Sequence, residues 1–505
     1  MKTYVLTGHD LNLENFCEMV YATQARFKLG DEAKSEILKS RNYIEARIKT
    51  GEVIYGVNTG FGAFSSVRIS DVDIEQLQKN LIRSHSAGIG EPFTREQSKG
   101  MMILRANTLA RGHSGVRIEV IEKILEFLNA DVIPLIPSQG SVGASGDLAP
   151  LSHLALALIG EGEVWGDDFK SIKPLKLKAK EGLSLINGCQ VMTAVGLLAL
   201  YDSRQLIKAA DIAGAMSLEG LRGSRKPFDP LIAATRNHSG EAPTARNLIR
   251  VMGERSEIGD SHLSETTDHR VQDAYSLRCM PAVHGAVKMA ITYAIKVLET
   301  EANSSTDNPL VFADAGKILS CGNFHGMPVA HAMDFAAIAI SSLASISHER
   351  ISKFISAQMS DLPPFLAPNG GLNSGHMIVQ VASASLVSEN KILSHPASVD
   401  SMPTSAEKED HVSMGSIAAR KFTTIVKNAQ HVIAMEFLAG TQALDLIAPL
   451  KPAAGVKAAF DLIRQQVPFA KEDRIFAKDI EKIRKLVTDG SVISVVEAIT
   501  GKLEI

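Results

Sequence analysis

Apolar residues in the second part of the chain recur at helical spacing. Ala336, Ile340, Leu343 and Ser347 fall on one stripe of a helix that contains the apolar stretch 335–346, because residues three or four positions apart share a helix face. A second stripe of small and apolar residues runs beside the first and leaves little polar face. We therefore expect this helix to be buried on most sides, as in the centre of a helical bundle.

A second helical pattern, near the end of the chain, has a clear polar face. Phe476, Ile480, Ile483 and Val487 form one apolar stripe, while lysine and glutamate residues lie off it. Such a stripe opposite a charged face is typical of an amphipathic helix on the surface of a globular protein. The pattern predicts a surface helix over 476–487.

Glycine and proline punctuate the first part of the chain, where Val53-Ile54-Tyr55 predicts a brief strand that enters a loop. Later segments show long helical spacing, and only 5% of the residues are aromatic, which favours a helical interior over a sheet sandwich. We expect a mainly α fold in two parts. Residues 1–190 form a loop-rich N-terminal part, and residues 191–505 form a long helical bundle with C-terminal helices.

Composition excludes several classes of protein. The 505 residues carry 53 Lys+Arg and 56 Asp+Glu, a net charge of −3, so no basic excess indicates nucleic acid as a partner. Four scattered cysteines fit a reducing compartment better than a disulfide scaffold. The first residues contain no apolar core of a signal peptide. The sequence also contains no run of about 18 uncharged apolar residues, so no membrane span is expected. A soluble cytoplasmic protein with no membrane partner is expected.

Familiar catalytic signatures are missing. The chain has no P-loop, and Gly60-Phe61-Gly62 lacks the third glycine of a dinucleotide fingerprint. Gly143 to Asp147 is no nucleophile elbow, because Asp147 occupies the closing glycine position. The sequence has neither His-Glu-x-x-His nor Cys-x-x-Cys, so no metal site is predicted.

The tripeptide Ala144-Ser145-Gly146 can carry unusual chemistry. In a tight turn, the unhindered amide nitrogen of Gly146 can attack the carbonyl carbon of Ala144. Loss of water closes a five-membered ring, and loss of the Ser145 hydroxyl as a second water leaves an exocyclic methylene. The flanking glycines permit the necessary dihedral angles. Taken alone, the tripeptide is more simply interpreted as part of a Gly/Ser loop that precedes a helix beginning near Leu148.

The longer string around the tripeptide changes this balance, because it resembles the signature of the aromatic amino-acid ammonia-lyase family. Six further blocks resemble that family in the same order along nearly the whole chain. The seven blocks lie at 55–62, 105–115, 139–153, 185–190, 272–279, 322–326 and 409–414.

The resemblance implies an electrophile, 4-methylidene-imidazol-5-one (MIO), formed from residues 144–146 without an external cofactor. It also implies a helical fold like that of the fumarase and aspartase superfamily. Members of this type are homotetramers in which segments of three subunits build each active site. A core of long helices from four chains would accommodate the apolar helix at 335–346.

Substrate preference is implied by Ser84-His85 and by Glu409, which are similar to the histidine-specific members. A carboxylate and an imidazole can hydrogen-bond a substrate imidazole but would be unpaired against a phenyl ring. The implied reaction releases ammonia from L-histidine and gives trans-urocanate, the first step of histidine degradation. Met327, Glu407 and Lys408 depart from the histidine-specific pattern. They leave open a lyase or 2,3-aminomutase for another aromatic amino acid, such as tyrosine or phenylalanine.

Two further alternatives come from other classes. One is a non-catalytic descendant that keeps the helical assembly as a binding scaffold. The other is a fumarase-like elimination that uses only side-chain acid and base and needs no backbone modification.

The resemblance also implies residue roles in proton transfer. Tyr55 is the candidate base, and Tyr275 orders the amine and the electrophile's surroundings. Glu409 either faces the substrate imidazole with His85 or takes part in proton transfer. Asp147 either acts as a base in the cyclisation or only caps the following helix.

The remaining roles concern binding. Arg278 is expected to hold the substrate carboxylate through a two-pronged ion pair, although a structural salt bridge is the alternative. Asn187 and Gln272 are expected to hydrogen-bond the electrophile's oxygen or the carboxylate. The alternative for Asn187 is a purely conformational role in the turn before Gly188. Phe324 is expected to form part of the wall, or otherwise ordinary core.

Overall fold

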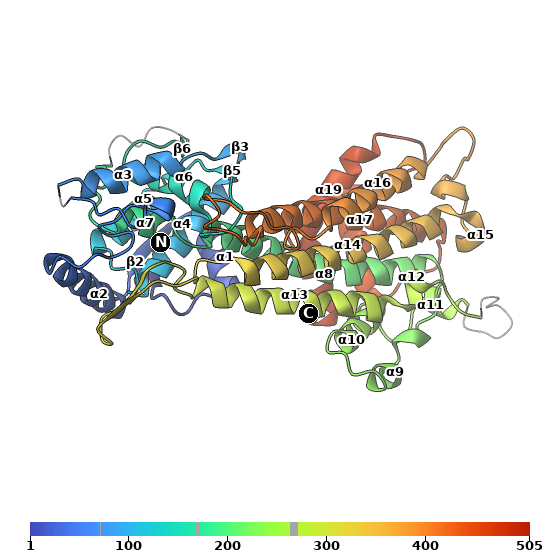
Figure 1. Cartoon of the computed structure of the whole chain (residues 1–505). Coiled ribbons are helices and arrows are strands. Elements are labelled where there is room, and N and C mark those ends of the chain that lie inside the picture. Colours follow the sequence, from blue (N-terminus) through green and yellow to red (C-terminus); the bar gives the residue numbers. More distant parts are fainter. Residues whose placement is uncertain (71, 167–171, 263–270) are drawn as a thin grey trace. The chain divides into compact units, whose positions relative to one another are not determined.

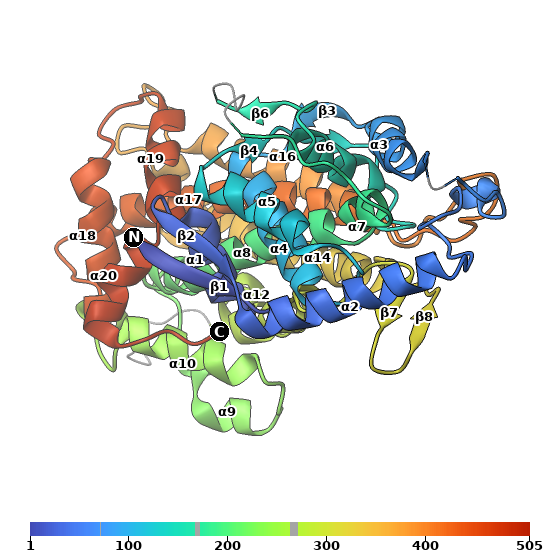
Figure 2. The ribbon, with the colours of Figure 1, turned by 90° about the vertical axis from the view of Figure 1, so that its left-hand side faces the viewer.

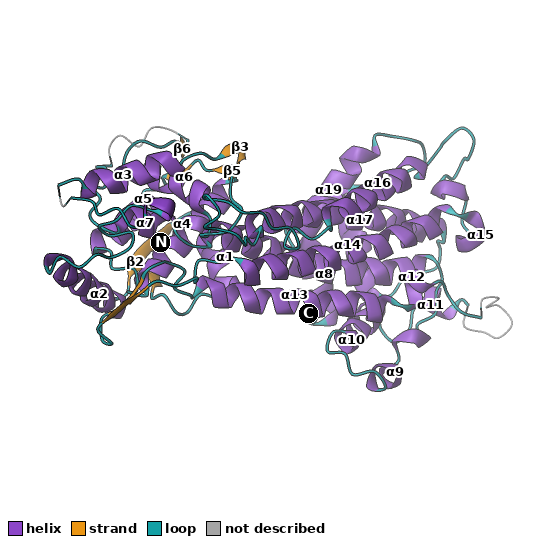
Figure 3. Ribbon diagram, in the orientation of Figure 1, coloured by secondary structure: helices purple, strands orange, loops and turns teal. Residues whose placement is uncertain are grey.

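The computed structural model describes residues 1–70, 72–166, 172–262 and 271–505. Helices dominate it and strands are short (Figure 3), so the prediction of a mainly α fold is confirmed. The chain forms two compact units, each built from three segments (Figure 1). Residue 190, where the sequence analysis divides the chain, is the first residue of helix α8. That two-part division stays a prediction.

The first unit contains residues 1–198, 294–334 and 396–420. Its described helices are α1 (Leu13–Tyr21), α2 (Asp31–Lys49), η1 (Gly62–Phe64), α3 (Ile74–His85), α4 (Arg95–Ala110), α5 (Ile118–Asn129), α6 (Leu148–Leu158) and α7 (Glu181–Ile186). Its described strands are β1 (Lys2–Leu6), β2 (Ala25–Leu29), β3 (Ile89–Pro92), β4 (Ile133–Pro134), β5 (Pro137–Gln139), β6 (Val164–Trp165), β7 (Leu310–Phe312) and β8 (Lys317–Leu319).

These strands form two-stranded sheets only. β1 and β2 pair in parallel, Lys2 opposite Ala25 through Leu6 opposite Leu29 (Figure 2), whereas β3–β5, β4–β6 and β7–β8 are antiparallel. Sheets this small cannot form a core by themselves. The helices therefore supply most of the buried surface.

The second unit contains residues 199–293, 335–395 and 421–505. Its described elements are η2 (Lys226–Phe228), α9 (Pro230–Ala234), α10 (Glu241–Met252), α11 (Glu257–Asp260), α12 (Tyr275–Arg278), α15 (Ala357–Ser360), η3 (Pro364–Leu366), α16 (Met377–Leu393), α18 (Ala454–Gln466), α19 (Phe476–Thr488) and α20 (Ser491–Thr500). Four longer helices have residues in both units: α8 (Gln190–Gly220), α13 (Met280–Ala302), α14 (Met327–Ile355) and α17 (Gly415–Leu446).

A buried ion pair joins the long helices within the second unit. Arg350 of α14 donates two hydrogen bonds to Glu436 of α17, at 2.6 and 2.8 Å. Ser217 of α8 and Ser347 of α14 donate to the same carboxylate, each at 2.6 Å. Because all of these groups are buried, their mutual hydrogen bonds offset the cost of removing two charges from water.

Most of the helix over 335–346 is buried or half-buried in the single chain, as expected, but one face is exposed. Ala336, Ile340 and Leu343 are fully buried, but Phe335 is 50% exposed and Ile338 is 45% exposed. The pattern located the helix, which lies within α14, and its buried stripe. It could not show that a further face of this helix, which carries Phe335 and Ile338, is exposed in one chain.

By length and composition alone, α14 could cross a membrane. However, 67% of its most apolar window is buried inside the protein, as in the core helix of a globular protein. The surface helix predicted near the end of the chain is confirmed as α19, with Ile480, Ile483 and Val487 buried.

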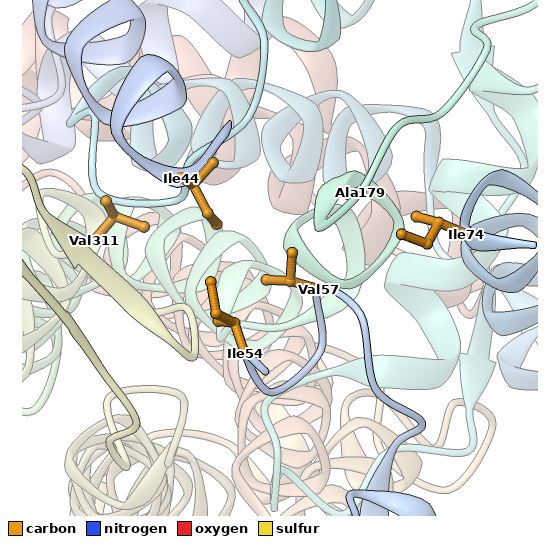
Figure 4. Packing of buried hydrophobic residues seen from close by; sticks show 6 residues of the cluster. All are labelled: Ile44, Ile54, Val57, Ile74, Ala179 and Val311. Carbon is orange, nitrogen blue, oxygen red and sulfur yellow. The ribbon is translucent and has the colours of Figure 1, made fainter. Parts of the chain in front are cut away.

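The strand predicted over 53–55 is wrong, because these residues enter a turn. Ile54 and Val57 belong to a buried apolar cluster that also contains Ile44, Ile74, Ala179 and Val311 (Figure 4). Ile54 and Val57 lie on either side of Tyr55 in the sequence. Packing of a turn therefore explains the apolar run, and it fixes the position of the tyrosine.

Candidate active site

The tripeptide 144–146 lies in a loop that only glycine can shape at two positions. Gly143 has φ +66° and Gly146 has φ +75°, in the left-handed region that glycine adopts without steric cost. A Cβ on Gly146 would meet the backbone of Gly188 closer than 3.0 Å, and one on Gly143 would meet Ser413 Oγ equally closely. The loop is therefore packed against two other segments of the first unit.

Hydrogen bonds hold this loop from both sides. On one side, Asp147 N donates to Gly188 O at 2.8 Å, and Asn187 Nδ2 donates to Ser145 O at 2.7 Å. On the other side, Ser413 Oγ donates to Gly143 O at 2.9 Å. The main chain on each side of Ser145 is thus clamped, while the Ser145 side chain stays available to a cavity.

Asp147 does not cap the helix that follows it. It is the N-cap residue of α6, yet its side chain bonds no amide there. Instead it accepts hydrogen bonds from Val191 N at 3.1 Å and Met192 N at 3.0 Å, at the start of α8, and from Ser141 Oγ at 2.9 Å. Complete burial raises the pKa of this carboxyl to about 6, because burial disfavours the charged form.

Ser145 and Glu409 meet directly. The Ser145 hydroxyl donates to one carboxylate oxygen of Glu409, and Thr404 Oγ1 and Ser405 Oγ donate to the other at 2.8 and 2.9 Å. Three hydroxyls therefore orient this carboxylate. No sequence motif indicated Thr404 or Ser405, since isolated hydroxyl residues carry little signal.

A cavity of about 670 Å³ opens over Ser145 in the first unit. This volume is within the range that small-molecule sites occupy. Seven of the residues proposed from sequence line it: Tyr55, His85, Ala144, Ser145, Asn187, Phe324 and Glu409. Gly146 is the next residue in the same loop.

Tyr55 and His85 reach the cavity from different elements. Burial raises the pKa of the Tyr55 phenol, and a hydrogen bond from the Gly62 backbone partly opposes this. Burial also lowers the pKa of His85, which favours the neutral ring. His85 Nδ1 lies 2.9 Å from Leu81 O, so Nδ1 carries the proton and Nε2 remains as an acceptor.

Asn187 has one satisfied and one unsatisfied group. Its Nδ2 bonds Ser145 O, but its buried Oδ1 has no hydrogen-bond partner among the described residues. A buried acceptor without a partner is costly and is often kept for function. Phe324 lines the cavity, and its carbonyl accepts a hydrogen bond from Cys189 Sγ at 3.0 Å.

The structure does not bring Gln272, Tyr275 or Arg278 to this cavity. All three lie in the second unit, where Gln272 is exposed and Tyr275 is 71% exposed. The Arg278 guanidinium lies 4.5 Å from the centroid of the Tyr275 ring, and Arg278 Nε donates to Asp273 O at 3.1 Å. These contacts are typical of a cation–π pair at an exposed site.

Several lining residues were missed by the sequence analysis, among them Asn308 and Cys321. Asn308 Oδ1 accepts from Cys321 N at 2.7 Å and thereby shapes the segment before Phe324. Lys408 also lines the cavity, whereas Met327 is not among the lining residues. Within the described part of the chain, no cluster of three or more His, Cys, Asp or Glu residues could hold a metal ion.

Comparison with known families identifies a close match. The sequence profile described as aromatic amino acid lyase matches residues 11–465. A protein named histidine ammonia-lyase from Anaeromyxobacter dehalogenans is 48% identical over 509 residues, covering 97% of this chain and 100% of that protein.

Solved structures agree with the sequence matches. A histidine ammonia-lyase from Trypanosoma cruzi is 41% identical, with a TM-score of 0.91, and the match covers 99% of this chain and 96% of that one. A tyrosine aminomutase from Streptomyces globisporus is 34% identical with a TM-score of 0.93, and the match covers 99% and 100% of the two chains. The same fold therefore occurs with more than one named activity.

Proposed function

Because the chain belongs to the aromatic amino acid lyase family, we propose that it eliminates ammonia from L-histidine to give trans-urocanate. It is a carbon–nitrogen lyase that acts in the first step of histidine degradation. The observation that carries the proposal is the meeting of Ser145, Asn187, Glu409 and His85 at one cavity. The relatives described above, which carry the name histidine ammonia-lyase, support the same substrate.

Residues 144–146 are the proposed source of the electrophile, and their surroundings fit it. The amide nitrogen of Gly146 bonds to the carbonyl carbon of Ala144, and its proton moves to the carbonyl oxygen. That oxygen leaves as water with the proton of the Ser145 nitrogen. The Ser145 hydroxyl then leaves as a second water with the α-proton. Two observations support this closure: Gly143 and Gly146 pack closely against other segments, and Asn187 donates a hydrogen bond to Ser145 O.

The resulting MIO group supplies an electrophilic methylene carbon that makes the substrate nitrogen a better leaving group. The chain's own side chains then position and deprotonate the substrate. With its proton on Nδ1, His85 has Nε2 as the acceptor nitrogen, which can receive the N–H of the substrate imidazole. Glu409, oriented by its hydroxyl partners, is the second polar group for that ring or for proton transfer.

Tyr55 is the proposed base for the proton on the β-carbon. Burial raises the pKa of its phenol, so the phenolate needs a cationic neighbour. Arg278 from a second copy of the chain is the candidate, with Tyr275 and Gln272 beside it. In the assembly Arg278 also holds the substrate carboxylate, since a guanidinium matches a carboxylate with two parallel hydrogen bonds.

A homotetramer is therefore part of the proposal. The second unit exposes large apolar side chains on three helices: Tyr293 on α13, Phe335 and Ile338 on α14, and Ile378 and Val381 on α16. Exposed apolar residues on several long helices of one unit favour burial against further copies. None of the four cysteines is in a disulfide, which suits a reducing compartment and is in keeping with a cytoplasmic enzyme.

Ultraviolet spectra test the function. The purified protein is incubated separately with L-histidine, L-tyrosine and L-phenylalanine, while released ammonia is measured. We expect the absorbance of urocanate and an equal amount of ammonia with histidine, and little reaction with the others. A β-amino acid product would instead identify an aminomutase. Turnover of tyrosine or phenylalanine without turnover of histidine would contradict the proposed substrate.

A further inference from the structure

Arg105 is a buried cation for which the proposed reaction has no role. It is 0% exposed and lies on α4, whose residues from Ser98 to Ala110 are all buried. Burial lowers the pKa of its guanidinium to about 10, so the group stays protonated near neutral pH. Removing a charge from water is costly, and its neighbours should therefore indicate what it does.

The Arg105 guanidinium holds the turn at 187–190. Its Nη1 donates to Asn187 O at 2.8 Å and to Gln190 Oε1 at 2.7 Å. Gln190 Nε2 in turn donates to Thr108 Oγ1 at 3.0 Å and to Thr306 Oγ1 at 2.7 Å. One arginine thus fixes both ends of the turn, directly and through an amide that is itself fully bonded.

An ordinary ion pair does not account for Arg105. The nearby carboxylate of Asp307 accepts hydrogen bonds from Lys180 at 2.8 Å and from Ser184 at 2.9 Å. Arg105 Nε and Nη2 have no hydrogen-bond partner among the described residues. The bonds that Arg105 does make all go to the turn, so the turn is the feature that this buried charge serves.

That turn is the surface against which the tripeptide is folded. Asn187 Nδ2 bonds Ser145 O at 2.7 Å, and Gly188 O accepts from Asp147 N at 2.8 Å. We infer that Arg105 is a positioning residue for the electrophile: it fixes the 187–190 turn that holds residues 144–146 in the conformation that cyclises. This inference rests on the proposed function, because it assumes that the ring forms.

Two consequences follow. Before the ring forms, a loosened turn would let residues 144–146 leave the conformation that cyclises, so cyclisation would slow. After it forms, a misplaced Asn187 amide would polarise the Ser145 carbonyl less. The second effect would lower kcat more than it raises KM, because the affected group binds the electrophile and not the substrate.

The test compares Arg105→Gln with a matched control, Arg41→Gln. Arg41 is also buried in the first unit and donates to two main-chain carbonyls, Gly115 O at 3.1 Å and Ala179 O at 3.0 Å, neither of which belongs to the 187–190 turn. Intact mass of the denatured proteins reports the fraction that has lost two water molecules. Thermal unfolding, and kcat and KM for histidine, are measured on the same samples.

We expect Arg105→Gln to be folded but to lose its two waters at least about tenfold more slowly than Arg41→Gln, with kcat reduced more than KM is changed. Arg105→Lys, which keeps the charge, should recover part of the loss. Full ring formation with unchanged kcat in Arg105→Gln would overturn the inference. Absence of the mass loss in the unsubstituted protein would instead overturn the proposed electrophile.

If Arg105→Gln does not fold, Thr306→Val makes the same test more gently. It removes one acceptor of the Gln190 amide and leaves the guanidinium in place. Slower loss of water at an unchanged unfolding temperature would support the role of the turn. Ring formation at the normal rate would contradict it.

Discussion

The Ser145 hydroxyl donates a hydrogen bond to the Glu409 carboxylate, although the two residues lie 264 positions apart in the chain. The group that dehydration would remove therefore faces the group best placed to exchange a proton with it. Thr404 and Ser405 keep the carboxylate in this orientation. The contact links formation of the electrophile to the same residue that the resemblance assigns to substrate binding or proton transfer.

Replacing Ser145 with alanine should separate the fold from the chemistry. Without Oγ the second dehydration cannot occur, so the intact mass should lack the loss of two waters. Histidine turnover should fall by about a thousandfold or more. Circular dichroism and the unfolding temperature should change little, because the hydroxyl makes one partly buried contact. Unchanged turnover would refute the proposed mechanism and would favour an elimination that uses side chains alone.

Gly188→Ala should disrupt the turn sterically. A Cβ there would lie 2.5 Å from Gln190 Oε1 and 2.7 Å from Arg105 Nη1, so the arginine's contacts would have to shift. We expect incomplete ring formation and a lower unfolding temperature. Gly316→Ala is the matched control, because its φ of +63° imposes strain while the nearest atom to the added Cβ, Tyr43 Oη, lies 3.8 Å away. It should cost about 1 kcal/mol of stability and leave the ring intact, as intact mass would show.

The sequence predicted the helical class and the tripeptide loop for different reasons. Apolar spacing located α14 and α19 because a helix has a fixed period. Gly143 and Gly146 were recognisable because their conformations admit no other residue without strain. Both signals are local, so a single sequence carries them.

Other features depend on contacts between distant segments. Neither Thr404 nor Ser405 could be matched to Glu409 in advance, because the match depends on a turn in which Ser405 has φ +52°. Asp147 bonds the start of α8 and not its own helix, which the adjacent sequence cannot show. Arg105 belongs to a recognised block, yet its target became clear only when α4 and the 187–190 turn were seen together.

The buried Asp147 predicts a specific pH dependence of stability. Its pKa in the folded chain is about 6, against 3.8 ordinarily. Between these values the folded state binds more protons than the unfolded state, so the free energy of unfolding should fall as pH rises. The contribution of this group is up to about 3 kcal/mol.

Asp147→Asn should remove that slope. Urea unfolding of both proteins at intervals from pH 4 to pH 7 isolates the effect, because other titrating groups contribute equally to each. The difference between the two curves should change through this window and level off above it. Parallel curves would show that Asp147 does not titrate there.

His85→Leu should alter substrate preference. The substitution removes the Nε2 acceptor and would leave the N–H of a substrate imidazole unpaired, so kcat/KM for histidine should fall by about a hundredfold. The slight reaction expected with phenylalanine serves as the internal control, because its ring needs no such acceptor and its kcat/KM should not fall in parallel. Equal losses for both substrates would indicate that His85 supports the fold of the site and not its selectivity.

Mixed oligomers test whether each active site combines different copies of the chain. Tyr55 lines the cavity of the first unit, whereas Tyr275 belongs to the second unit and is exposed. Tyr55→Phe and Tyr275→Phe should each be nearly inactive alone, because each removes one phenol from every site.

If a site takes Tyr55 from one copy and Tyr275 from another, co-expressed variants should regain part of the activity, since some sites then receive both native tyrosines. If both phenols of a site came from one chain, every site would keep one defect and the mixture would stay inactive. Two different affinity tags, one on each variant, select the mixed oligomers in two successive purification steps, and light scattering checks their size. A mixture of separately purified, unexchanged tetramers is the control that should show no recovery.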